Sequence, residues 1–142
     1  MLEQLCKEHT DLTREDICQL QQIRAQLPLM ADLMGQDVFL DCLTCDGCVM
    51  VVAQAQPSTA DSAYRQNVVG EYALREKEPA VYHALQSHAP ARDIKAVTQE
   101  DCAVRQDVVP TQIMRPPLTF VSLSTLAVSS LIIQSSLCIW WE

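Results

Sequence analysis

Two runs of strand-forming residues joined by a tight-turn pair constrain the fold of this chain more than any other feature. Residues 37–43 (DVFLDCL) and 48–53 (CVMVVA) are rich in β-branched, aromatic and other apolar side chains. The pair Asp46-Gly47 lies between them, and Asp-Gly pairs are favoured where a hairpin turns. The sequence therefore predicts an antiparallel hairpin over residues 37–53.

A helical pattern precedes the hairpin. Thr13 followed by acidic residues is typical of a helix start, and an apolar stripe at helical spacing follows at Ile17, Leu20 and, less regularly, Ile23. Because proline has no backbone N–H, we expect Pro28 to interrupt this helix or to start a second one.

The end of this helical region is also marked in the sequence. We expect Leu29, Met30 and Leu33 to continue the apolar face, and Gly35 to cap the C-terminal end.

The second half of the chain predicts a loop, a helix and a strand. Residues 54–63 are polar and contain Pro57, which indicates a loop. Pro79 suits the first turn of a helix, and its inward face would hold Val81, Tyr82 and Leu85. Residues 92–102 are mixed and polar and predict no regular element. Residues 104–110 predict a strand that ends at Pro110. The expected fold class is α+β.

Charge disappears from the sequence after Pro116-Pro117. All ten Lys and Arg residues precede that point, and residues 116–141 carry no charged side chain. We therefore divide the chain into an N-terminal helical segment (1–35), a core (36–115) and an uncharged tail (116–142).

Three interpretations of the tail are open. Residues 118–141 are long enough to cross a bilayer as a helix. Residues 120–124 (FVSLS) alternate as a sheet strand does. The third interpretation, which we favour, is a reading-frame error, because it explains the sudden change of composition.

Composition excludes some classes of function. The net charge is -8 and the ten basic residues are scattered, which argues against a nucleic-acid partner. The seven cysteines accompany no visible secretory signal, so we expect reduced thiols and a cytoplasmic location.

Several segment strings, in this order, resemble one family. They are LCKEHTDL (5–12), LPLMADL (27–33), DVFLD (37–41), VVGEYALRE (68–76) and VRQDVVP (104–110). Together they resemble the N-terminal sensor domain of soluble bacterial histidine kinases, a group that includes kinases similar to those governing ethanolamine utilisation.

The resemblance implies a GAF-like or PAS-like antiparallel sheet with N-terminal helices, here incomplete at its C-terminal end. It implies a sensory domain that binds a small-molecule signal and biases a C-terminal kinase domain, which acts with a cognate response regulator, in a protein that works as a homodimer. None of the three histidines lies in a recognisable phosphoacceptor setting. We therefore expect no catalysis by this chain alone, and no cofactor, since ATP would bind only in the kinase domain.

The spacing Cys42-x-x-Cys45-x-x-Cys48 permits another class of function. Thiolates at this spacing can bind zinc or an iron–sulfur cluster, with Cys102 or Cys18 as a fourth ligand. Alternatively, Cys42 and Cys48 are small apolar residues of the paired strands, which the Asp46-Gly47 turn favours. A metal or redox sensor thus stays an alternative to the sensory domain of a kinase, as does a membrane-tethered adaptor held by the tail.

Seven polar residues are candidates for contact with a small ligand. Four form a dense polar cluster beside an apolar run, namely Glu71, Tyr72, Arg75 and Glu76, and three add positive charge for an anionic ligand, namely Arg92, Lys95 and Arg105. The alternative is a solvated surface with weak local ion pairs.

Overall fold

The computed structural model describes residues 1–98, 100–111 and 119–126, and within them the chain has an α+β fold with three helices and six strands. The helices are α1 (Leu2–His9), α2 (Arg14–Met34) and α3 (Pro79–Ser87). The strands are β1 (Asp37–Leu43), β2 (Val49–Ala55), β3 (Tyr72–Ala73), β4 (Ala91–Val97), β5 (Ala103–Pro110) and β6 (Thr119–Leu126). The predicted fold class is confirmed.

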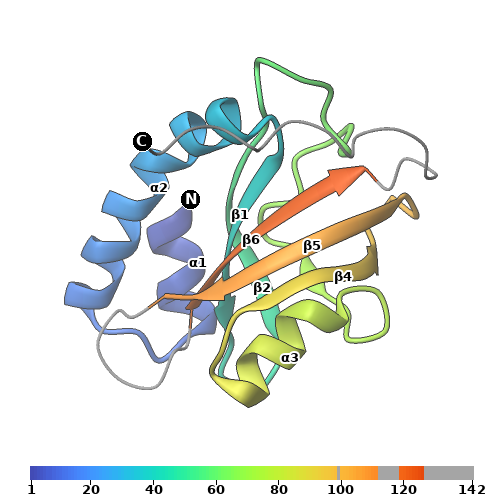
Figure 1. Cartoon of the computed structure of the whole chain (residues 1–142). Coiled ribbons are helices and arrows are strands. Elements are labelled where there is room, and N and C mark those ends of the chain that lie inside the picture. The colour runs from blue at the N-terminus through green and yellow to red at the C-terminus, as the bar shows by residue number, and fades with distance from the viewer. Residues whose placement is uncertain (99, 112–118, 127–142) are drawn as a thin grey trace, which may run out of the picture.

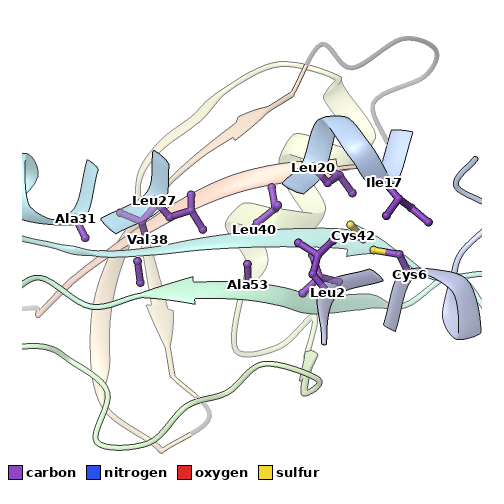
Figure 2. Close-up of a cluster of buried hydrophobic side chains, with 12 residues drawn as sticks. Leu2, Cys6, Ile17, Leu20, Leu27, Ala31, Val38, Leu40, Cys42 and Ala53 are labelled. Carbon is purple, nitrogen blue, oxygen red and sulfur yellow. The ribbon is translucent and has the colours of Figure 1, made fainter. Parts of the chain in front are cut away.

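The strands form one antiparallel sheet in the order β3-β2-β1-β6-β5-β4. Helices α1 and α2 lie together on one side of the sheet, whereas α3 lies on the other side (Figure 1). The first side holds an apolar core that α1 and α2 make with alternate residues of β1, among them Val38 and Leu40 (Figure 2). The remaining β1 residues therefore face the side that α3 covers.

Helix α2 begins and ends where the sequence predicts. The Thr13 hydroxyl accepts a hydrogen bond from the Asp16 N–H, and the Asp16 carboxylate accepts one from the Thr13 N–H, which is a capping box. At the other end Gly35 has a left-handed backbone (φ 62°) and donates to the Ala31 carbonyl at 2.8 Å.

The expected interruption at Pro28 is wrong, because α2 runs unbroken through it. Pro28 lies on the exposed side of the helix, as does Arg24, whose carbonyl would otherwise accept from position 28. Water can therefore satisfy that carbonyl, and the cost of the missing hydrogen bond is reduced.

The apolar face expected at the end of α2 is wrong for Leu29 and Leu33, whereas Met30 is partly buried and packs against the core. The buried residues there are Leu27 and Ala31, while Leu29 and Leu33 are 59% and 77% exposed. A residue two positions along a helix lies about 200° further around the axis, since each residue turns by about 100°. Leu27 and Ala31 continue the line that begins at Leu20, so Leu29 and Leu33 lie on the outer side.

The predicted hairpin is confirmed as β1 and β2. Gly47 has a positive φ of 82° at the turn, and Val52 is an extra residue on β2 where the register shifts. The strand β4 was not predicted. Its alternation is broken at Asp93, which has a φ of 54° within a register shift against β5, so its sequence does not show the period of two.

The sheet continues past the boundary that we expected after residue 115. Strand β6 pairs with β1 on one side and with β5 on the other, so it lies in the middle of the sheet. For Thr119–Leu126 the strand interpretation is therefore the one observed, and the sheet has the strand that we expected it to lack. Residues 116–118 and 127–142 lie outside the described residues. Within the described ranges, no helix is long and apolar enough to span a bilayer.

Candidate functional site

The side of the sheet away from α1 and α2 carries two separate apolar clusters. Helix α3 covers one, which includes Leu43 of β1 and Val108 of β5. The segment between β2 and β3 covers the other, which includes Phe39 of β1 and Val104 of β5. The ring of Tyr64, from that segment, packs on Phe39 with 4.8 Å between centroids.

Buried polar side chains, here called the buried layer, lie between members of these two clusters on β1 and on β5. Because side chains alternate along a strand, Asp41 lies between Phe39 and Leu43 on the same face, and Gln106 lies between Val104 and Val108. Asp41 and Gln106 are each only 1% exposed. The Gln106 side-chain amide donates to the Glu78 carboxylate at 3.0 Å, and Glu78 is 5% exposed.

The segment that leads into α3 brings Glu78 over the sheet. It starts at the edge strand β3 and crosses to the opposite edge, where the Lys77 carbonyl accepts from the Val97 N–H of β4 at 2.8 Å. The hydroxyl of Tyr82 in α3 donates to the Ala73 carbonyl of β3 at 2.8 Å. The Arg75 guanidinium lies over the Tyr82 ring, 4.4 Å from its centroid. Glu78 is therefore held from both edges of the sheet.

Two carboxylates anchor the segment that covers the second cluster. Asp37, at the start of β1, accepts from the Ser62 hydroxyl at 2.6 Å and from the Ala63 N–H at 2.7 Å. Burial outweighs these hydrogen bonds and raises the pKa of Asp37. Asp32 of α2 accepts from the Ser58 N–H at 2.6 Å, and this lowers the pKa of Asp32. These contacts hold residues 56–71 over the second apolar cluster.

The seven predicted ligand residues are all exposed and do not form one group around the buried layer. Glu71 and Glu76 are exposed, Tyr72 is 38% exposed on the edge strand β3, and Arg75 is engaged with the Tyr82 ring. Their assignment to a ligand stays a prediction.

The three predicted basic residues lie near the other edge of the sheet. Arg105 of β5 pairs with Asp93, and Arg92 of β4 is 3.5 Å from the Asp107 carboxylate. Lys95 is exposed on the same edge strand as Arg92. Two of the three cations are therefore already paired with carboxylates of this chain.

The structure does not bring Cys42, Cys45 and Cys48 together. Cys42 is fully buried against α1, whereas the other two are exposed at the turn. The Cys45 thiol donates to the Asp11 carboxylate at 3.3 Å, which raises the pKa of Cys45 and so disfavours the thiolate that a metal requires. Among the side chains that the structure describes, no group of three or more His, Cys, Asp or Glu could hold a metal ion.

Sequence reasoning missed the buried layer of Asp41, Gln106 and Glu78. One signal was available, because Asp41 and Gln106 each stand between apolar residues of the same strand face. A polar residue at a core position of a strand costs free energy unless it has partners or a function. Across β6, Asp41 is level with Pro110 of β5, and Gln106 is level with Asp37 of β1. This alignment cannot be read from local patterns.

Comparison with known proteins identifies the family. The sequence model of the GAF domain of histidine kinase PdtaS matches residues 2–125. The chain belongs to this GAF-domain family. The match extends over both N-terminal helices and nearly all of β6. The chain is thus a sensory GAF domain of the histidine-kinase type, as the resemblance implied.

A solved structure confirms the GAF-like fold. The sensor region of a sensor histidine kinase superimposes with a TM-score of 0.69 at 21% sequence identity. The alignment covers 92% of this chain and 43% of that one, so the GAF domain described here spans less than half of that protein chain. No curated protein matches the sequence.

Proposed function

We propose that this GAF domain binds a small molecule at the buried layer of Asp41, Gln106 and Glu78. The observation that carries the proposal is the buried contact between Gln106 and Glu78, the residue that precedes α3. Asp41 is a second buried carboxylate on the same face of the sheet, between Phe39 and Leu43 of the two apolar clusters. A few placed polar groups among apolar walls are what orients a small ligand. Two carboxylates favour a ligand that donates hydrogen bonds, such as a protonated amine.

Transmission of the signal forms the second part of the proposal. Binding under α3 would favour one arrangement of the segment that crosses from β3 to β4, and a ligand shifts a conformational equilibrium by its difference in affinity for the two states. We propose that a kinase domain in the full-length protein responds to this shift and passes phosphate to a cognate response regulator. We further propose that the protein acts in the cytoplasm as a homodimer.

Titration of the ¹⁵N-labelled chain with a set of small primary amines tests the ligand site. We expect backbone amide shifts around Asp41, Glu78 and Gln106, which report binding at the layer. Glu78→Gln keeps the shape of the side chain but removes its charge, so we expect it to weaken binding at least about tenfold, or about 1.4 kcal/mol.

The matched control is Glu76→Gln, since Glu76 is exposed two residues away. It should bind as the unchanged chain does. Equal effects of the two substitutions, or shifts confined to Arg92, Lys95 and Arg105, would contradict a site in the buried layer and favour the exposed residues instead.

A further inference from the structure

Two buried cysteines join the first helix to the sheet. Cys6 of α1 and Cys42 of β1 are each 0% exposed and belong to the same core cluster. Figure 2 shows their sulfur atoms pointing toward one another across the contact between α1 and β1. Both are free thiols. Most of the cluster around them is aliphatic, including Leu2 and Leu20.

The two thiols interact directly. The hydrogen bond between them lowers the pKa of Cys6 and raises that of Cys42 well above its ordinary value. Cys6 is therefore the member of the pair that more readily becomes a thiolate, which is the reactive form.

We propose that Cys6 and Cys42 form an oxidation-sensitive dithiol, whose disulfide would tie α1 to β1. Hydrogen-bonded sulfurs must approach by roughly 1.5–2 Å to reach the roughly 2.05 Å of a disulfide bond. Helix α1 has only eight residues and buries only Leu2 and Cys6, so it can make a shift of this size. This inference is independent of the ligand site proposed above.

A peroxide such as hydrogen peroxide is the oxidant. The Cys6 thiolate attacks one peroxide oxygen, the O–O bond breaks, and a sulfenic acid and hydroxide form. The Cys42 sulfur then attacks the sulfenic sulfur, and the S–O bond breaks with loss of water. In total two thiols and one hydrogen peroxide give one disulfide and two waters. A brief opening of α1 gives so small an oxidant access to the pair.

A chain that keeps only these two cysteines tests the proposal. Cys18, Cys45, Cys48, Cys102 and Cys138 are all changed to Ser, and the folded protein is treated with hydrogen peroxide. We expect loss of both thiols, a monomer lighter by about 2 Da and a linked peptide pair by mass spectrometry. Its unfolding temperature should rise by roughly 10 °C, and dithiothreitol should reverse every change.

The matched control is the same chain with Cys42→Ala, which leaves Cys6 alone. It should give no linked peptides and no rise in unfolding temperature. The proposal is overturned if the two-cysteine chain gains about 16 or 32 Da without a link. Disulfide-linked dimers would also overturn it, as would thiols that react only after the protein is unfolded, because neither outcome uses the pairing seen in the fold.

Discussion

Thr13 and Asp16 show how two side chains determine where the longest helix begins. Both are at the surface, so their contribution comes from hydrogen bonds to the free N–H groups of the first turn rather than from packing. We expect Thr13→Ala to lower the free energy of unfolding by about 1 kcal/mol. Urea denaturation measures this, with Gln22→Ala on the exposed side of the same helix as control. Equal stability of the two variants would contradict the cap.

Asp37 gives a pH dependence whose sign follows from its burial. The pKa of Asp37 is raised, so the folded state binds this proton more tightly than the unfolded state does. The contribution of Asp37 to stability should therefore improve as pH falls through the raised pKa, and level off below the ordinary value of 3.8. The measurement compares the unchanged chain with Asp37→Asn by urea denaturation from about pH 7 to about pH 4.

The informative result for Asp37 is how the difference in free energy of unfolding between the two chains changes with pH. The substitution also alters the hydrogen bonds from Ser62 and Ala63, but that contribution to the difference does not depend on pH. The unchanged chain should gain stability relative to Asp37→Asn as the pH is lowered. A stability difference that stays flat over this range would show that Asp37 titrates alike in both states.

At the scale of elements, we expect that replacing Pro28 within α2 increases the stability of the protein. Proline in a helix interior costs about 3 kcal/mol relative to alanine, part of which is offset because proline also restricts the unfolded chain. Since Pro28 is exposed and no side chain need replace its packing in the core, we expect Pro28→Ala to raise the free energy of unfolding by about 2 kcal/mol. Chemical denaturation checks this against Gln26→Ala; a loss of stability would mean that the ring makes contacts that matter.

The elements also show what the sequence could and could not predict. The start of α2, the hairpin and the start of α3 follow from local motifs at Thr13, Asp46-Gly47 and Pro79, and the structure contains all three. Strand β4 was missed because a bulge at Asp93 disrupts its alternation. The side of α2 that faces the core was misjudged after Pro28, because apolar residues occur on two sides of the helix there.

The candidate site was less predictable than the fold, since it depends on contacts between distant segments. In the sequence Glu78 directly follows Arg75, Glu76 and Lys77 and is not distinguished from these charged neighbours. The path of the chain from β3 to β4 buries it against Gln106. Arg92 and Arg105 were predicted to bind an anionic ligand because they are positively charged. In the structure their carboxylate partners, Asp107 and Asp93, lie on the neighbouring strand of the β4–β5 pair. Local composition identifies charge, whereas burial depends on the fold.

For the whole molecule, β6 decides whether there is one sheet or two. It is the only strand that joins β1 to β5 in the order observed among the described residues. Without it the hydrogen-bonded ladders would be β3-β2-β1 and β5-β4, each with a newly exposed edge that invites association. The uncharged sequence after Pro116, which looked foreign to the domain, therefore supplies its central strand.

Two truncated chains test this dependence. A chain of residues 1–118 lacks β6, so we expect it to lose cooperative unfolding and to associate. A chain of residues 1–126 keeps both ladders of β6 and should unfold in one cooperative transition, as the family match over residues 2–125 also indicates. Circular dichroism during heating, together with sedimentation, distinguishes them. Cooperative unfolding of a monomeric 1–118 chain would show that α3 and the segment crossing from β3 to β4 hold the two halves together without the central strand.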